Sequence, residues 1–337
     1  MGARWSASFY APDGLDSEAV RQALQAAVNE VDTQMSTWNP NSDLMRLNAG
    51  RAGAWVNVPP CLMEVLRLAL DIGRASGGAF DVGVGAAVRA WGFGPEAVDE
   101  VRIRKALEMR HPPAHEIVDL DVEGGRVRKL APVDLDLNGI AKGYGVDRLA
   151  AVLHGLGIAS GLVGIDGEMR AFGLHPAGEP WVIAVEAPDP DRRAPHSILA
   201  LHDAAVATSG DYRHWLMAGG RRLSHTMDPR RGAPLPEPPA SVTVIARTCA
   251  EADAWATALM VLGPKAGTQL AERERLNALF LLRGAESTLQ SAMADSTVRA
   301  SPWRSISTTQ GTTVPRVDCQ TSAEAKPAER IRQPKAM

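Results

Sequence analysis

The order of strand-like and helix-like segments is what most limits the fold of this sequence. Residues 3–11 alternate between apolar and polar side chains, which predicts a strand, and residues 16–36 carry apolar side chains at helical spacing, which predicts a helix. Residues 118–129 carry an Asp-Val-Glu-Gly-Gly hairpin between alternating runs, and further strand patterns lie within residues 160–173, 181–188, 197–210 and 241–247. Because strands and helices do not alternate strictly, we predict an α+β fold with a largely antiparallel sheet core and packed helices.

The domain organisation follows from where these patterns stop. Residues 251–263 and 264–276 each predict a helix, residues 277–283 predict a strand, and residues 101–107 fit either a short helix or a short strand. From residue 298 onward Ser, Thr, Gln, Pro and Lys dominate and periodic apolar residues vanish. We predict one structured unit in residues 1–297, open to division into two lobes with a ligand site between them, and a disordered polar tail in 298–337.

Composition narrows the class of protein. The 337 residues carry a net charge of −3, and the pI is about 6.3, so no global basic field recruits nucleic acid. No apolar run reaches the roughly 18 residues that a membrane span needs, and the start lacks a secretory signal pattern, which predicts a cytoplasmic protein without a membrane span. The three cysteines show no CxxC spacing, so a cysteine-based zinc or disulfide framework is not expected. Composition does not indicate an oligomeric state.

A glycine turn enters a helix at residues 138–142, directly after a predicted strand. Such a turn leaves backbone N–H groups and the positive end of the helix dipole facing outward, which suits a phosphate group. Lys142 adds a cation at the same place. The alternative interpretation is a tight glycine turn with a solvated lysine, because the segment matches neither a Walker A nor a GxGxxG pattern.

Two other segments carry polar groups in loop contexts. The glycine-rich stretch 77–94 permits close backbone approach to a ligand, or else forms an irregular loop packed by its own aromatic side chains. His225 and Asp228 lie three residues apart ahead of a Pro-Arg-Arg-Gly turn. They fit an acid/base pair, and they fit equally a structural His–Asp hydrogen bond.

Asp253 and Thr257 lie four residues apart on one face of the helix predicted over 251–263. A carboxylate among small apolar neighbours is costly unless something pairs with it. Together with backbone carbonyls and phosphate oxygens, the pair could complete a Mg²⁺ site. The alternative is an aspartate favoured by the helix dipole and a threonine bonded back to a carbonyl.

Seven segments in register resemble the FAD:protein FMN transferase family, the ApbE-like flavin transferases. The resemblance runs from residue 1 to roughly residue 292 and is carried by "MSTWNPNSDLMRLN", "GGAFDVGVG", "DLDLNGIAKGYGVDRLA", "GIDGEMRAFG", "VATSGDY", "HTMDPRRGAPL" and "EADAWATAL". It implies an ApbE-like fold with layers related to the T-fold and makes residues 1–297 a flavin transferase domain. It also implies that the enzyme takes FAD as substrate, uses Mg²⁺, transfers FMN to a Thr or Ser hydroxyl of an acceptor flavoprotein and releases AMP.

The resemblance also assigns site residues. It implies that Asp253, Thr257 and the carbonyl of Ala141 hold the metal. His225 matches the histidine of the family's H-x-x-D-P-x-x-G pattern and Asp228 its acid, so the catalytic group is His225, Asp228 and Lys142. His225 is expected to act as a base or a positioning group, and Lys142 to stabilise phosphate charge. The residues expected to bind the flavin nucleotide are Met35, Trp38, Phe80, Asp81, Asp136, Gly139, Glu168, Thr208, Ser209 and Gly210.

Two departures and two rival functions accompany this resemblance. Asp166 stands in a segment where the family usually reads Gly-Gly, and Asn138 stands where Gly or Ser is frequent. Family members are often periplasmic or envelope-anchored. One rival function is a Mg²⁺-dependent FAD pyrophosphatase, in which water replaces the protein hydroxyl, and the other is a non-catalytic FAD-binding protein.

Overall fold

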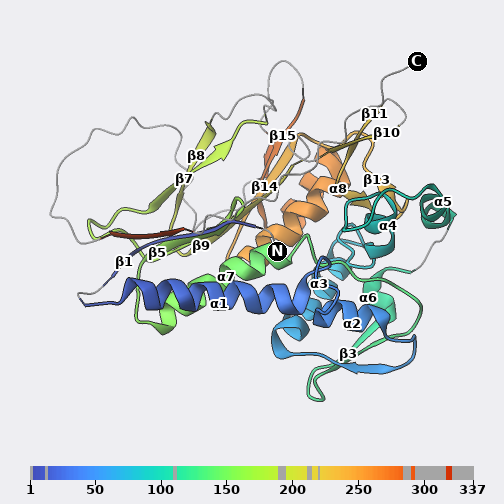
Figure 1. The fold of residues 1–337 in the computed structure, drawn as a ribbon. Coiled ribbons are helices and arrows are strands. Elements are labelled where there is room, and N and C mark those ends of the chain that lie inside the picture. The colour runs from blue at the N-terminus through green and yellow to red at the C-terminus, as the bar shows by residue number, and fades with distance from the viewer. Residues whose placement is uncertain are drawn as a thin grey trace, which may run out of the picture.

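An eight-stranded antiparallel sheet organises the fold in this computed structural model (Figure 1). The structure describes residues 3–11, 14–108, 112–188, 195–210, 215–218, 221–283, 290–292 and 316–320. The strand order is β16-β15-β14-β9-β6-β5-β1-β17, and every neighbouring pair is antiparallel. The strands are β1 (Trp5–Tyr10), β5 (Gly161–Ile165), β6 (Glu168–Phe172), β9 (Ala204–Gly210), β14 (Ser241–Ala246), β15 (Asn277–Leu281), β16 (Gln290–Ala292) and β17 (Arg316–Gln320). The predicted α+β fold with a largely antiparallel sheet is confirmed.

Three long helices lie along this sheet. They are α1 (Ser17–Met35), α7 (Ala141–Gly155) and α8 (Cys249–Arg273). Helices α7 and α8 pack on the sheet and on each other, and α1 packs along α7, as Figure 1 shows. Apolar side chains at helical spacing make these contacts, among them Leu24 on α1 and Leu149 on α7, both fully buried. Asp16 caps α1, and Thr248 with Glu251 forms a capping box at the start of α8.

The two helices predicted in residues 251–276 form one helix with a kink. Gly263 has a φ of 70° inside α8, and Pro264 follows it. A proline has no N–H to donate and its ring displaces the preceding turn, so the helix changes direction there. The sequence pattern therefore separated two helical segments that the chain joins without a loop.

The remaining elements form a second region beside the helices. A three-stranded antiparallel sheet in the order β2-β4-β3 closes it, and the predicted hairpin around Gly124 is its β3–β4 connection. Residues 101–107, which fit helix or strand, lie in helix α5. The elements are α2 (Asp43–Ala49), β2 (Trp55–Asn57), α3 (Pro60–Ala75), α4 (Gly85–Ala90), α5 (Glu100–Glu108), α6 (Ala114–Ile117), β3 (Val118–Asp121) and β4 (Arg126–Lys129).

Three two-stranded pairs complete the described chain. β7 (Trp181–Glu186) pairs with β8 (Pro195–Leu201), β10 (Trp215–Ala218) with β11 (Arg221–Ser224), and β12 (Met227–Asp228) with β13 (Ala233–Pro234).

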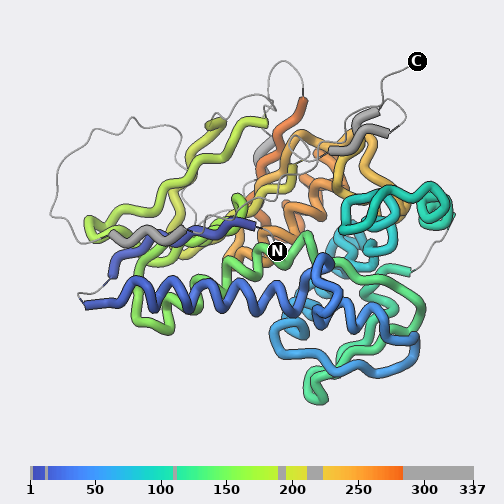
Figure 2. Tube along the Cα trace, in the orientation of Figure 1, coloured from blue at the N-terminus to red at the C-terminus, as the bar shows by residue number. Residues whose placement is uncertain are grey.

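Segments far apart in the sequence meet in the main sheet. The trace in Figure 2 shows the blue N-terminal strand beside green segments from the middle of the chain, where Trp5 pairs with Ile165. One hydrophobic cluster lies between strands β1 and β5 and helices α1 and α7. A larger cluster surrounds α3 and α8. Of the residues 298–337, for which we predict disorder, only Arg316–Gln320 are described, as strand β17; the rest of that tail lies outside the described residues. None of the helices in the described part of the chain is long and apolar enough to cross a membrane.

Candidate active site

The start of α7 lies against the first turns of α8. A Cβ on Gly143 would stand 2.7 Å from the carbonyl carbon of Cys249 and 2.9 Å from the Cα of Ala250, so only a glycine lets the two backbones approach this closely. At this crossing the backbone N–H of Gly143 donates to Oδ2 of Asp253 at 3.1 Å. Asp253 is 5% exposed. The predicted metal ligand on α8 thus reaches the glycine-containing turn that opens α7.

Thr257 lies one turn further along α8 and meets the same segment. A Cβ on Gly139 would come within 3.1 Å of the Thr257 hydroxyl oxygen and 3.2 Å of the Phe80 ring. The Thr257 hydroxyl also lies 3.2 Å from the hydroxyl of Ser209 on β9. Gly139 and Gly143 therefore both touch α8, and Ala141 lies between them in the chain. Ala141, which precedes Asp253 by 112 residues in the sequence, is thereby brought to the stretch of α8 that carries Asp253 and Thr257.

An ion pair between half-buried Lys142 and buried Glu168 stands beside Asp253. Lys142 on α7 forms an ion pair and a hydrogen bond with Oε1 of Glu168 on β6. Burial would lower the pKa of Lys142, but the negative charges of Glu168 and Asp253 raise it above its ordinary value. Burial, with a further contribution from the charge of Glu168, raises the pKa of Asp253 to about 7, against the opposing effects of Lys142 and the Gly143 N–H.

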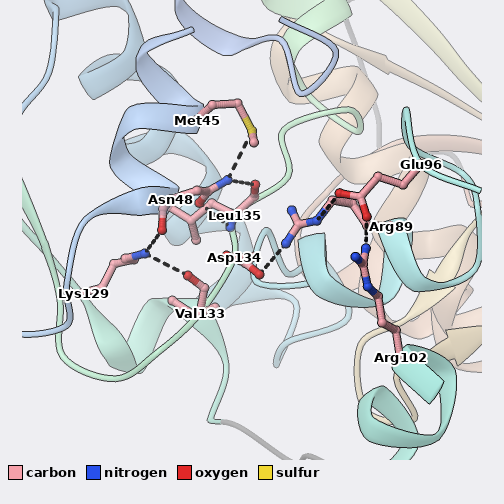
Figure 3. Close-up of polar contacts among 9 residues, drawn as sticks. All are labelled: Met45, Asn48, Arg89, Glu96, Arg102, Lys129, Val133, Asp134 and Leu135. Atoms are coloured by element: carbon pink, nitrogen blue, oxygen red, sulfur yellow. Dashed lines mark hydrogen bonds and ion pairs between the residues drawn. The ribbon is translucent and has the colours of Figure 1, made fainter. Parts of the chain in front are cut away.

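Side chains from three elements hold the extended segment 133–137 that leads into this turn (Figure 3). The amide of Asn48 on α2 donates to the Leu135 carbonyl and accepts from the Leu135 N–H, each at 2.8 Å. The ammonium of Lys129, 4% exposed, donates to the carbonyls of Asn48 and Val133 at 2.7 and 3.1 Å. An ion pair between Arg89 on α4 and Asp134 is the third contact that holds this segment. Asn48 thus supplies the hydrogen bonds that a neighbouring strand would otherwise make.

Phe80, Asp81 and Asp136 lie together because segment 80–84 runs beside segment 134–136. The Asp136 N–H donates to the Val82 carbonyl at 2.8 Å. Asp136 accepts hydrogen bonds from the N–H and side-chain amide of Asn138, and burial raises its pKa to about 6. Asp81 accepts from the N–H groups of Gly83 and Ala114. These carboxylates shape the loops beside the Gly139 turn.

The other candidate residues lie at different depths. Trp38 follows α1 and is 60% exposed, so its ring is available to a ligand, whereas Met35 is buried in the core. Neighbouring residues of a strand face opposite sides of the sheet. Ser209 faces α8, and the hydroxyl of Thr208 lies 2.9 Å from that of Thr243 on β14, on the other side. Gly210 ends β9.

His225 and Asp228 belong to a separate hairpin. His225 is half-buried in the turn between β11 and β12, and Asp228 ends β12. The Asp228 carboxylate accepts from the N–H of Arg230 at 3.0 Å and so closes the Pro-Arg-Arg-Gly turn. This contact gives Asp228 a part in holding the turn, and its pairing with His225 stays a prediction. The carbonyl of Gly232 in the same turn accepts from the indole of Trp91.

The local backbone conformation explains why an aspartate stands at position 166. It forms the two-residue turn between β5 and β6 together with Gly167, and both have positive φ, 48° and 113°. An Asp-Gly pair is favoured in such hairpin turns. The Asp166 side chain is exposed and accepts from the N–H of Arg4 at 3.1 Å. The departure from Gly-Gly therefore serves the turn.

Several contributors to the site gave no sequence signal as chemical groups. Asp147 on α7 accepts hydrogen bonds from the N–H groups of Cys249 and Ala250, both at 2.9 Å, and pairs with Arg170 at 2.6 Å. It thereby fixes the start of α8 from the neighbouring helix. Asp147 was visible only as one polar residue on a helical pattern, as Asn48 and Lys129 were on theirs.

The donor set at Asp253 fits a hard divalent cation. In the described part of the chain no three His, Cys, Asp or Glu residues gather into a metal cluster. The predicted ligands are instead one carboxylate, one hydroxyl and one carbonyl, all oxygen donors of the kind that Mg²⁺ prefers. Among the described residues, the Gly143 N–H is the one hydrogen-bond donor to Asp253, so the carboxylate keeps an oxygen for a cation.

The fold and site define an α+β protein with an oxygen-donor site at the crossing of two helices beside an antiparallel sheet. The chain belongs to the ApbE family, whose model matches residues 1–280. It is 37% identical over 286 residues to an FAD:protein FMN transferase of Vibrio cholerae serotype O1, covering 84% of this chain and 85% of that relative. It is 31% identical to the FAD:protein FMN transferase of Escherichia coli K12 over 297 residues, covering 85% and 83%.

Solved structures agree with this assignment. The flavin transferase ApbE from Vibrio cholerae superimposes with a TM-score of 0.76 at 33% identity, covering 86% of this chain and 94% of that one. The flavinyl transferase ApbE of Pseudomonas stutzeri, in its apo form, gives a TM-score of 0.74 at 36% identity, covering 85% and 90%. The resemblance inferred from seven sequence segments is confirmed.

Proposed function

We propose that this chain transfers FMN from FAD to a serine or threonine hydroxyl of an acceptor protein and releases AMP. The names of its relatives support FMN transfer from FAD to a protein. The observation that carries the proposal for this chain is the gathering of Asp253, Thr257 and the Gly139–Gly143 turn beside Lys142. Oxygen donors that can hold Mg²⁺, next to the positive charge of Lys142, suit a pyrophosphate.

The chemistry is a displacement at phosphorus. The acceptor hydroxyl oxygen forms a bond to the FMN-side phosphorus, the bond from that phosphorus to the bridging oxygen breaks, and AMP leaves with the electron pair. We assign the hydroxyl proton to His225, with Asp228 holding the turn behind it. Lys142 stabilises negative charge on the phosphates. Ala141, Asp253 and Thr257 would hold Mg²⁺, which would supply positive charge to the pyrophosphate oxygens.

The flavin nucleotide is proposed to lie along the loops that surround the Gly139 turn. The exposed ring of Trp38 would cover the isoalloxazine. Ser209 reaches this side of the sheet through its contact with Thr257. The other residues assigned to this pocket are Met35, Phe80, Asp81, Asp136, Gly139, Glu168, Thr208 and Gly210.

Mass spectrometry tests the proposal directly. The protein, FAD and MgCl₂ are incubated with a threonine-containing acceptor domain, and AMP is measured in the same samples. We expect the acceptor to gain one FMN with the wild type and with the control Asp71→Asn, an exposed carboxylate on α3. Asp253→Asn is expected to lose at least about 100-fold in rate, as for loss of a charged metal ligand.

The other outcomes separate the rival functions. Release of AMP and FMN without labelling of the acceptor would identify an FAD pyrophosphatase. Binding of FAD with neither product would leave a non-catalytic flavin-binding protein. Full activity of Asp253→Asn would contradict the metal assignment.

A further inference from the structure

Glu168 is a buried carboxylate, and among the described residues one of its two oxygens has a partner. It lies at the start of β6 and is 3% exposed. Its Oε1 pairs with Lys142, while its Oε2 is buried and has no hydrogen-bond partner among the described residues. A buried carboxylate oxygen without a partner costs free energy, so such a group calls for an explanation.

The surroundings of Glu168 hold one cation for two carboxylates. The Lys142 ammonium is attracted by both Glu168 and Asp253, and its contact is with Glu168. The neighbouring carboxylate, half-buried Asp147, has its own partner in Arg170 at 2.6 Å. Among the described residues the contact of the Lys142 ammonium is with Glu168, so Lys142 does not occupy the Asp253 oxygens.

We propose that Glu168 is a positioning residue of the divalent-cation site, which keeps the Lys142 ammonium on β6 and so leaves Asp253 free to bind the cation. This inference rests on the proposed function for the existence of that site. Without Glu168, the remaining buried carboxylate that attracts Lys142 is Asp253. The Lys142 ammonium would then pair with Asp253 and occupy the oxygens that the cation needs, and its positive charge would repel a dication.

The prediction concerns cation binding in the absence of flavin. Glu168→Gln is expected to weaken binding of Mn²⁺, used as a spectroscopic probe, by about tenfold or more, in the range seen for residues that orient metal ligands. Lys142→Met removes the competing cation and is expected to bind Mn²⁺ more tightly than the wild type. The double variant should recover to within about threefold of the wild type, because no ammonium remains to occupy Asp253.

The measurement is a titration of the free-Mn²⁺ electron paramagnetic resonance signal with each full-length variant, followed by competition with Mg²⁺. Glu272→Gln, an exposed carboxylate on α8, controls for the loss of one negative charge. Thermal unfolding checks that each variant folds. Should Glu168→Gln fail to fold, Glu168→Asp keeps the charge but shortens the reach to Lys142, and it is also expected to weaken Mn²⁺ binding.

Three results would overturn the inference. One is wild-type Mn²⁺ affinity in Glu168→Gln, and another is a double variant as weak as Glu168→Gln, since Glu168 would then not act through Lys142. In either case the loss of binding in Asp253→Asn and the transfer of FMN would still stand. If Asp253→Asn itself binds Mn²⁺ like the wild type, the cation site is wrong and the inference falls with it.

Discussion

Asp136 and Asp253 illustrate how this chain carries buried charge near its candidate site. Both carboxylates are nearly inaccessible to solvent, and burial is the largest cause of the raised pKa of each. They differ in what satisfies them. Asp136 accepts two hydrogen bonds from Asn138, whereas Asp253 accepts one from Gly143 among the described residues. The hydrogen bonds from Asn138 thus satisfy Asp136 within the fold, whereas Asp253 has a single hydrogen-bond donor among the described residues.

The pKa of Asp136 predicts how stability depends on pH. Its pKa is about 6 in the folded protein and 3.8 ordinarily, so between these values the folded state holds a proton that the unfolded state has lost. The contribution of Asp136 to the free energy of unfolding therefore falls, by on the order of 3 kcal/mol, as pH rises from about 4 to about 6, and stays constant above that. Urea unfolding of the metal-free protein at several pH values measures this.

The matched variant for this measurement is Asp136→Asn. It cannot ionise, so its unfolding free energy should fall by less than that of the wild type over the same range. Asp71→Asn, exposed on α3, should run parallel to the wild type. Identical pH profiles for Asp136→Asn and the wild type would contradict the raised pKa.

At the residue scale, the sequence predicted the site residues that can be identified from their spacing within one element. Asp253 and Thr257 stand out because a carboxylate and a hydroxyl share one face of an otherwise apolar helix. Asn48 and Lys129 could not be found this way. Asn48 bonds to the backbone of Leu135, 87 residues away, and Lys129 bonds to that of Asn48, 81 residues away, as well as to nearby Val133. Nothing in the sequence around Asn48 or Lys129 indicates the distant contacts.

At the scale of elements, the crossing of α7 and α8 fixes the site. Gly143 permits close approach, Asp147 accepts from the first N–H groups of α8, and Asp253 accepts from the Gly143 N–H in return. α7 has no side-chain cap at its own N-terminus. The two helix starts are therefore satisfied in part by each other's carboxylates, which ties the position of Asp253 to the packing of the helices.

Gly143→Ala tests this packing. The added Cβ would overlap the Cys249 carbonyl, and the backbone there has no room to yield. We expect the free energy of unfolding to fall by about 1–3 kcal/mol or more. Gly155→Ala is the matched control on the same helix: nothing lies within 4 Å of its added Cβ, and it should gain about 0.4–1 kcal/mol. Urea unfolding measures the free energy of unfolding of both variants. Equal effects of the two substitutions would contradict the close approach of α7 and α8 at Gly143.

Most elements were predictable because their signals are local. Alternating runs indicated β5 and β6, and helical spacing indicated α1 and both halves of α8. What local patterns could not supply is the order of pairing, in which β6 lies beside β9 and β1 beside β5. Those partners are set by which faces bury against α7 and α8, and each pairing spans tens to more than a hundred residues.

At the scale of the whole molecule, the candidate site joins segments from most of the structured chain. Trp38 follows α1 and Phe80 precedes α4, Lys142 and Asp253 lie in the first turns of α7 and α8, and Ser209 lies next to the last residue of β9. These segments also bound the larger hydrophobic cluster around α3 and α8. A ligand that holds them together favours the folded state of the whole unit over the unfolded chain.

Ligand-dependent thermal unfolding therefore reports on the site as a whole. FAD alone should raise the melting temperature, and FAD with MgCl₂ should raise it further, because ligands that bind only the folded state add about 2.7 kcal/mol at a hundred times their dissociation constant. In Asp253→Asn we expect the increment from MgCl₂ to vanish while most of the shift from FAD alone persists. The control Asp71→Asn should keep both shifts. If MgCl₂ stabilises Asp253→Asn as much as the wild type, then the cation binds elsewhere, and the convergence of Ala141, Asp253 and Thr257 serves the fold instead of the nucleotide.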